Sequence, residues 1–389
     1  MVGEYSLLYT NYIYYMTMIC MIMVAAPYYN LFKEGSISDV RVNRISKLSG
    51  IIIMSALFAL VFGMRWDVGM DNLTYLRIYT NNETSRYSTE FLFKFMNDAL
   101  YKMGVHYAIY FIIFAFIQVF LLYYTFKNEA YLWVFLTLSL FGGHFFYDWM
   151  NGMRQEMASC IMLFGTNFII ARKPWKYLLC IIFAAGFHIS AVLFIFIYPI
   201  MVSGKKKVPN IKSQLIILAI CAGIILIVGD ILSRFFPILD VLKQVVGEKG
   251  YMETYNEQTL QRFSDMTNIG VMFYIFLMIN VIIMAYSNRI ISFFGSHNRR
   301  KIIIYYNLYF WGTIFETLLA TNMVLIRPFR YFRIYKLIFI AYLLYYIYKH
   351  PSTLSTTIFW VVVMVLIGCV GVKAITAPFN FFFEVSGAP

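Results

Sequence analysis

Residues 131–170 read YLWVFLTLSLFGGHFFYDWMNGMRQEMASCIMLFGTNFII, and this stretch decides the class of fold. Two apolar runs flank a short polar stretch at positions 147–156. Its polar side chains are Asp148, Asn151, Arg154, Gln155 and Glu156. Ionisable groups within a bilayer cost at least about 2.5 to 3.5 kcal/mol each, so they are retained mainly for function. A loop whose charges reach water would explain one such residue, but a group of them favours a functional site.

The composition of the whole chain agrees with a membrane environment. Of the 389 residues, 61% are hydrophobic and only 13% are charged, which predicts an all-α, polytopic membrane protein. The start shows no cleavable signal pattern, so we expect the first apolar run to remain. The cysteines lie in apolar runs without metal-ligand or redox spacing; they are Cys20, Cys160, Cys180, Cys221 and Cys369.

The net charge of +13 does not predict nucleic-acid binding, because the basic residues alternate with apolar runs. Nucleotide-binding glycine loops, metal-ligand clusters and serine or cysteine nucleophile arrangements are absent from the sequence. We therefore expect no metal and no cofactor. An enzyme of this kind would act on lipid-linked substrates.

Runs long enough to span a bilayer recur along the chain. They are 11–32, 48–66, 105–126, 131–147, 153–171, 177–202, 213–232, 269–287, 302–326, 334–348 and 354–373. Lysine and arginine gather in the loops around 33–47, 172–176, 205–212 and 289–301, which places these loops on the cytoplasmic side.

The run 177–202 has basic residues at both ends, so it should enter and leave on the same side. The break falls at residues 185–190, with Gly186 as the permissive turn residue and His188 at the tip of a re-entrant hairpin. Counting the hairpin as two, we expect about twelve transmembrane or re-entrant helices with both termini outside.

The chain should form a single integral membrane domain over residues 1–389. Two outer segments are long enough to fold. In segment 67–104, the triplet Ser88-Thr89-Glu90 precedes FLFKFMNDALYKM, a capping pattern that predicts an interfacial helix. Segment 233–268 mixes Pro237, Gly247 and Gly250 with charged residues, which favours a lid-like loop.

Four groups of residues are candidates for chemistry. Asp71 and Tyr75 are four apart and would share a helix face, although a polar loop explains them equally well. Arg154, with Asn151 and Gln155, could bind an anionic or hydroxyl-rich ligand. His188 could act as a base, donate to a ligand oxygen, or cap backbone carbonyls.

The fourth group is the stripe Arg327, Arg330 and Arg333, with Lys336 beyond it, on a helix starting near Pro328. Arginine forks suit phosphate oxygens. The predicted topology places the stripe outside, against the positive-inside tendency. The alternative is a topology that is wrong by one span, which would make the stripe an ordinary cytoplasmic anchor.

Several short motifs resemble the EpsG-like family of bacterial exopolysaccharide polymerases, a branch of the Wzy-type polymerases. They are GMDNLTY near residue 70, NGMRQEMA at 151–158 and AAGFHISAVLF after RKPWKY. The resemblance covers most of the chain and is closest over residues 148–199. It implies a GT-C-like, metal-independent glycosyltransferase in the bacterial inner membrane, with its active site facing outside or the periplasm.

The resemblance also implies a reaction and its partners. A growing chain would pass from undecaprenyl pyrophosphate to the next lipid-linked oligosaccharide repeat unit, with release of undecaprenyl pyrophosphate. Expected partners are that lipid-linked oligosaccharide, the bilayer and a chain-length regulator, without nucleic acid. Matching motif residues carry over as Asp71, Tyr75, Asn151, Arg154, Gln155 and His188.

We assign roles to these residues as hypotheses. Arg154, Arg327, Arg330 and Arg333 would hold pyrophosphate. Asp71 or His188 would activate the acceptor hydroxyl, Tyr75, Asn151 and Gln155 would bind sugars, and Asp148 and Glu156 would orient their neighbours. The competing functions are an O-antigen-ligase-like transferase, a lipid-linked oligosaccharide flippase or transporter, and a membrane acyltransferase.

Overall fold

In the computed structural model, the described part of the chain is all-α apart from one pair of two-residue strands. The described residues are 2–31, 42–69, 71–87, 89–203, 208–228, 269–321 and 326–384. The chain divides into two compact units. The first contains Met1–Gly204 and Leu337–Pro389, and the second contains Lys205–Lys336. Segment 233–268, expected to be a lid-like loop, lies outside the described residues.

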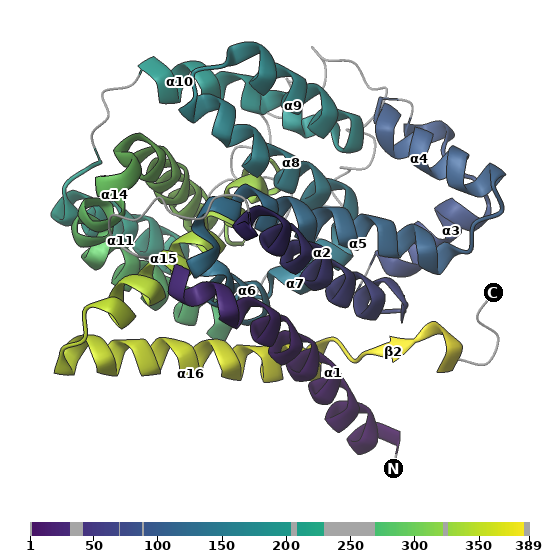
Figure 1. The fold of residues 1–389 in the computed structure, drawn as a ribbon, viewed down its shortest axis with the longest axis horizontal. Coiled ribbons are helices and arrows are strands. Elements are labelled where there is room, and N and C mark those ends of the chain that lie inside the picture. The colour runs from purple at the N-terminus through teal and green to yellow at the C-terminus, as the bar shows by residue number, and fades with distance from the viewer. Residues whose placement is uncertain are drawn as a thin grey trace. The chain divides into compact units, whose positions relative to one another are not determined.

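The first unit contains most of the helices (Figure 1). In chain order its elements, with η for a 3-10 helix, are α1 (Val2–Ala25), η1 (Ala26–Leu31), α2 (Val42–Gly63), β1 (Arg65–Trp66), α3 (Asn72–Thr80), η2 (Ser85–Tyr87), α4 (Phe91–Lys102), α5 (Tyr107–Thr125), η3 (Lys127–Leu132), α6 (Trp133–Gly142), α7 (Phe145–Asn151), α8 (Met153–Ile170), α9 (Pro174–Phe187), η4 (Ile189–Phe196), α10 (Ile197–Ser203), α16 (Thr353–Thr376), β2 (Asn380–Phe381) and η7 (Phe382–Glu384). Helix α15 (Arg333–Lys349) begins in the second unit and continues into the first.

Within the part of the chain that the structure describes, five helices are long and apolar enough to cross a membrane. They cover Leu7–Tyr29, Ser46–Gly63, Tyr107–Thr125, Val271–Ser296 and Thr353–Thr376. A sixth span results if Lys127–Gly142 and Phe145–Asn151, which meet at a 62° bend, are counted together. The chain is therefore a polytopic membrane protein, as predicted.

The expectation of about twelve segments was wrong for the described residues, where five or six helices qualify. Three further apolar helices are too short, at 10–17 residues, and are Pro174–Phe187, Ile189–Val202 and Ile211–Ile227. For the described residues, the number was overestimated because an apolar run indicates burial but does not distinguish burial in lipid from burial in protein. Helices α8 and α15 are buried over much of their length against neighbouring helices.

Close helix packing holds the first unit together. Helix α2 lies along α5, and a Cβ atom at Gly63 would lie 2.6 Å from the Ile112 Cα. Gly142 makes a similar approach to Leu366 of α16. Small residues of this kind let membrane helices approach closely. An aromatic cluster around Phe62, formed with Tyr14, Phe146 and Phe379, fills the space where α1, α2 and α7 converge.

The backbone after the second span is fixed by a short sheet. Strand β1 pairs with β2 in antiparallel register, with Arg65 opposite Phe381 and Trp66 opposite Asn380. The C-terminal strand follows α16, drawn in yellow in Figure 1, and returns to the end of α2. The chain leaving α2 therefore has a fixed direction into α3, which belongs to the candidate site.

The hairpin predicted within 177–202 is present. His188 ends α9 with extended backbone (φ −151°, ψ 114°), and η4 starts at the next residue. The two arms, α9 and η4, pack together, and the Tyr177 hydroxyl of α9 donates a hydrogen bond to the Phe194 carbonyl of η4 at 2.9 Å. The predicted break therefore falls at the histidine itself.

Segment 67–104 folds into α3, η2 and α4. The interfacial helix expected after Ser88-Thr89-Glu90 corresponds to α4, but the residue that precedes it is Glu90, whose side chain makes no capping bond. Phe93 and Asn97 face the interior, whereas Phe91 and Phe95 are exposed. Its placement at a membrane interface stays a prediction.

The second unit is built on α11 (Ile211–Val228) and α14 (Val271–Leu318). Helix α14 has 48 residues and continues through the basic stretch 289–301, which we had expected to be a loop. It is kinked at Asn298, whose side chain accepts a hydrogen bond from the Lys301 amide at 3.0 Å. The 3-10 helix η6 (Arg327–Phe332) then leads into α15.

Candidate functional site

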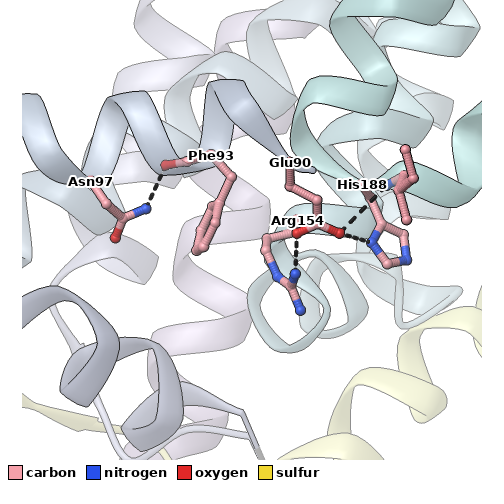
Figure 2. Close-up of polar contacts among 6 residues, drawn as sticks. Glu90, Phe93, Asn97, Arg154 and His188 are labelled. Atoms are coloured by element: carbon pink, nitrogen blue, oxygen red, sulfur yellow. Dashed lines mark hydrogen bonds and ion pairs between the residues drawn. The ribbon is translucent and has the colours of Figure 1, made fainter. Parts of the chain in front are cut away.

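A buried carboxylate joins two of the predicted functional residues. Oε1 of Glu90 lies 2.8 Å from Nδ1 of His188, and Oε2 pairs with Nη1 of Arg154. The Ile189 amide also points at Oε1, at 3.4 Å. Figure 2 shows the Glu90 side chain between the guanidinium and the imidazole. We call Glu90, Arg154 and His188 the carboxylate cluster.

Three separate elements supply the carboxylate cluster. Glu90 precedes α4, Arg154 lies in the first turn of α8, and His188 lies between α9 and η4. The side chains of Glu90 and His188 are only 4% and 5% exposed, and that of Arg154 is 19% exposed. Charges this deeply buried need partners, which explains why the carboxylate faces both basic groups.

Aromatic rings enclose the guanidinium of Arg154. Its Cζ lies 4.5 Å from the ring centroid of Tyr87, 5.2 Å from that of Phe93 and 5.9 Å from that of Tyr75. Rings at these distances favour a cation and exclude water. Nε of Arg154 is buried and has no hydrogen-bond partner among the described residues. A buried donor of this kind is suited to an oxygen atom of a ligand.

The polar stretch 147–156 is divided by a helix break. Helix α7 ends at Asn151, Gly152 has φ −89° and ψ 45°, and α8 starts at Met153. Two buried side chains bind carbonyls at this break. Arg65 donates to the Met150 carbonyl at 2.8 Å, and Gln118 donates to the Met153 carbonyl at 3.2 Å. These bonds fix the direction in which α8 starts, and thereby the position of Arg154.

A hydrogen bond connects the motif near residue 70 with the polar stretch. The Asn151 side-chain oxygen accepts from the Asp71 amide at 3.0 Å. Asp71 precedes α3, and the Tyr75 amide donates to the Asp71 carbonyl at 2.9 Å. The expected helix is therefore present, and its Tyr75 faces Arg154. A Cβ at Gly69, where φ is +94°, would lie 2.9 Å from Asn151 Oδ1, so this position favours glycine.

Electrostatics hold Glu90 in its ionised form. Burial alone would raise the pKa of its carboxyl group, but the hydrogen bond to His188 and the charge of Arg154 outweigh burial. The pKa of Glu90 is therefore below its usual value. Burial also raises the pKa of the Tyr75 hydroxyl, partly offset by the charge of Arg154. Near neutral pH the site presents an anionic Glu90 and a neutral Tyr75.

The arginine stripe forms a second polar cluster, within the second unit. Glu316 pairs with Arg333 Nε at 3.1 Å and with Lys336 Nζ, and Arg330 acts on it electrostatically. Arg327 and Arg330 lie in the 3-10 helix η6, where residues three apart share a face. We call Glu316, Arg330, Arg333 and Lys336 the cationic cluster. Among the described residues, Glu316 is the acid that these basic side chains face.

The sequence identified most of the carboxylate cluster but missed Glu90. It was interpreted as part of a capping motif, although its side chain caps no helix. One signal could have identified it, because a buried Arg154 requires a nearby acid. Glu156 was predicted to orient its neighbours, and that role stays a prediction. Gln155 and Glu156 are both buried, and the sugar-binding role of Gln155 stays a prediction.

The described residues contain no group of three or more histidine, cysteine, aspartate or glutamate side chains placed to hold a metal ion. The sequence model of the EpsG family matches residues 50–385. No curated protein and no solved structure matches the chain significantly.

Proposed function

Because the chain belongs to the EpsG family, we propose that it is a polysaccharide polymerase of exopolysaccharide biosynthesis. It would join oligosaccharide repeat units carried on undecaprenyl pyrophosphate and release undecaprenyl pyrophosphate. The observation that carries this proposal is the buried carboxylate cluster, in which Glu90 pairs with both Arg154 and His188. A glycosyl transfer needs a group that accepts a proton and groups that stabilise a departing anion, and the protein offers both kinds.

His188 is the general base of this proposal. With Nδ1–H donating to the Glu90 carboxylate, the lone pair of the imidazole lies on Nε2, and that nitrogen can accept a proton. The low pKa of Glu90 supports this assignment, since the proton then stays on the imidazole. Glu90 acts as a positioning residue, which sets the tautomer and orientation of His188.

The proposed step transfers a glycosyl group from pyrophosphate to the acceptor hydroxyl. The acceptor hydroxyl attacks the anomeric carbon of the donor, its proton passes to Nε2 of His188, and a glycosidic bond forms. The bond between the anomeric carbon and the pyrophosphate oxygen breaks, and undecaprenyl pyrophosphate leaves as an anion. A general base typically contributes about 10²- to 10⁴-fold to such a step.

Asp71 is the alternative base. Its backbone amide is bound by Asn151, which holds it beside the polar stretch. However, Asp71 lacks the buried carboxylate–imidazole pair that prepares His188 to accept a proton. We therefore favour His188, and propose that Asp71, Tyr75, Asn151 and Gln155 bind the sugars.

Arginines supply the anion-binding groups in this proposal. Arg154 has its charge matched by Glu90, so it would contribute directed hydrogen bonds more than net charge. Its buried Nε supports this role. The cationic cluster gathers three basic side chains around Glu316, and we propose that it binds pyrophosphate together with Arg327. Positioned arginines facing a developing negative charge are a large electrostatic contribution to catalysis.

Location and architecture complete the proposal. We propose that the protein is a single membrane domain in the bacterial inner membrane, with a GT-C-like architecture and an active site that faces outside. Its partners would be the bilayer, the lipid-linked oligosaccharide and a chain-length regulator. A metal-independent mechanism is part of the same proposal.

The experiment uses the purified protein in liposomes with one lipid-linked repeat unit, and detects a ladder of lipid-linked polymer. His188→Asn keeps a side-chain amide that can donate to Glu90 but removes Nε2. We expect it to retain thermal stability and to lose polymer by about 10²- to 10⁴-fold. Polymer at the unsubstituted level would overturn the base assignment. Transfer to a different acceptor without a ladder would favour a ligase, and lipid translocation without bond formation would favour a flippase.

A further inference from the structure

Helix α4 packs on the α9–η4 hairpin, and the length of the hairpin limits how far it can extend into a membrane. Helix α9 has 14 residues, so it is about 21 Å long, whereas the hydrocarbon core is about 30 Å thick. The hairpin starts beside the exposed basic residues Arg172, Lys173 and Lys176 and turns at the buried His188. The hairpin is therefore long enough to cross only about two thirds of the core.

Helix α4 lies directly on the tip of the hairpin. A Cβ at Gly186 would lie 2.7 Å from Leu92 Cγ, so Leu92 rests on the glycine. An α-helix with its side chains is about 10–12 Å across, close to the depth that the hairpin leaves unfilled. The contact of Leu92 with Gly186 therefore puts the N-terminal half of α4 beyond the hairpin tip.

The exposed face of α4 changes in character along its length. In the N-terminal half it presents Phe91 and Phe95, which are 49% and 67% exposed. In the C-terminal half the exposed side chains are Tyr101 and Lys102, with Asp98 partly exposed. The ammonium of Lys94, in the N-terminal half, is directed to this end, 2.6 Å from Asp98. One end of the helix is therefore suited to acyl chains and the other to headgroups and water.

The hairpin beneath α4 presents a similar apolar surface. Trp175, Leu179, Ile182 and Phe183 recur at helical spacing along α9 and are each at least 45% exposed. This stripe is typical of a helix that faces lipid. It continues toward the tip on which α4 rests, so one apolar surface extends from α9 to the N-terminal half of α4.

We propose that the N-terminal half of α4 is immersed in the acyl chains of the leaflet opposite the basic loops, above the hairpin tip. Glu90 immediately precedes Phe91, so the carboxylate cluster lies at lipid depth and a lipid-linked substrate can reach it from the side. This placement depends on the exposed faces and helix lengths, and not on the proposed reaction.

Site-directed spin labelling in liposomes tests the proposal. The label is placed at Phe95→Cys, and the matched control is Arg77→Cys on α3, whose arginine side chain is 59% exposed. Labelling of the unsubstituted chain gives the background from Cys20, which is partly exposed. We expect the label at position 95 to collide several-fold more with oxygen than with a water-soluble nickel chelate, and the label at 77 to show the reverse.

Two outcomes would overturn the proposal. Position 95 could match position 77, which would place α4 in water. It could also be shielded from both reagents, which would indicate a protein partner or a second copy. A bimane fluorophore at Phe91→Cys provides an independent measurement. We expect lipids with a nitroxide midway along the acyl chain to quench it more than lipids with a nitroxide on the headgroup, and equal or reversed quenching would contradict the proposal.

Discussion

Nδ1 of His188 lies 2.8 Å from Oε1 of Glu90, although 98 residues separate them in the sequence. The other oxygen of the same carboxylate pairs with Arg154. A single acid therefore neutralises or orients two basic groups from different parts of the chain. Because all three side chains are largely buried, changes to one should be felt by the others, and the first two predictions depend on this coupling.

Replacing Glu90 with glutamine should destabilise the protein and abolish polymer formation. The substitution leaves Arg154 buried without a counter-charge, which typically costs about 3–5 kcal/mol. The thermal unfolding of purified protein in detergent measures the first effect, and the liposome polymer assay measures the second. An unchanged unfolding temperature would show that Glu90 does not compensate Arg154.

A double substitution separates the stabilising role from the catalytic one. Glu90→Gln combined with Arg154→Met removes both charges, so we expect it to recover much of the stability that Glu90→Gln alone loses. Polymer formation should stay lost, because His188 lacks its carboxylate. Polymer at the unsubstituted level in the double variant would reduce the carboxylate cluster to a structural ion pair.

Stability should depend on pH through Glu90. Its pKa in the folded protein is lowered, whereas in the unfolded chain it is about 4.3. Its stabilising contribution is therefore fully present above that unfolded pKa and is lost as the pH falls through the lower folded pKa. The difference in unfolding temperature between the unsubstituted protein and Glu90→Gln should be constant from neutral pH to about pH 5 and shrink at lower pH. A difference that persists undiminished at the most acidic pH would contradict this assignment.

The sequence predicted the class of fold and several local features, for physical reasons. Composition alone indicated a polytopic helical membrane protein. The basic residues on both sides of 177–202 predicted the hairpin, because positive charges do not readily cross a membrane. The four-residue spacing of Asp71 and Tyr75 allowed either a shared helix face or a polar loop, and the structure shows the helix, with Asp71 at the N-cap of α3.

Long-range relationships could not be predicted in the same way. Glu90 lies 64 residues from Arg154, and nothing in its local sequence distinguishes a site residue from a helix cap. The expected number of membrane spans exceeds the five or six found in the described residues, because apolar runs do not distinguish a span from a short helix packed in protein. The stretch 289–301 was interpreted as a loop because it is polar, yet it continues the helix α14 with one kink at Asn298.

The packing of α2 on α5 predicts a sharp contrast between two glycines. Gly63→Ala should destabilise the protein by about 1–3 kcal/mol or more, since the new Cβ would lie 2.6 Å from the Ile112 Cα and backbone cannot easily move. Gly368→Ala on α16 is the control, because a Cβ added there would have no atom within 4 Å. Thermal unfolding of both variants measures the contrast, and equal effects would contradict the close approach.

Arg65 should act as a buried positioning residue for the start of α8. Its guanidinium donates to the Phe62 and Met150 carbonyls at 2.7 and 2.8 Å and lies 4.8 Å from the ring centroid of Phe111. In Arg65→Met, each carbonyl left without a partner should cost about 1–3 kcal/mol.

The control for Arg65 is Arg77→Met, whose exposed pairing with Glu83 contributes little. Arg65→Lys retains one directed donor, so we expect partial recovery of both unfolding temperature and polymer formation. If Arg65→Met reduced stability but left polymer formation unchanged, Arg65 would support the fold without positioning Arg154.

Glu316 provides the test of the cationic cluster. It lies between Arg333 and Lys336, with Arg330 acting on it. Glu316→Gln should lower the unfolding temperature, because Arg333 and Lys336 then lose the carboxylate with which they pair. The same variant should bind inorganic pyrophosphate more tightly, since no carboxylate competes for the basic groups. A ligand raises stability with its concentration relative to Kd, so the pyrophosphate-induced shift in unfolding temperature reports the affinity.

The size of that shift, compared among variants, distinguishes an anion site from an internal ion-pair network. It should be largest in Glu316→Gln, intermediate in the unsubstituted protein and smallest in Arg330→Gln, which removes a cation while leaving the pairs of Glu316 in place. Lys94→Gln on α4 is the control and should leave the shift unchanged, because Lys94 pairs with Asp98 at 2.6 Å in the first unit. A smaller shift in Glu316→Gln than in the unsubstituted protein would mean that the cations require Glu316 to keep their positions, and pyrophosphate would then have to bind elsewhere.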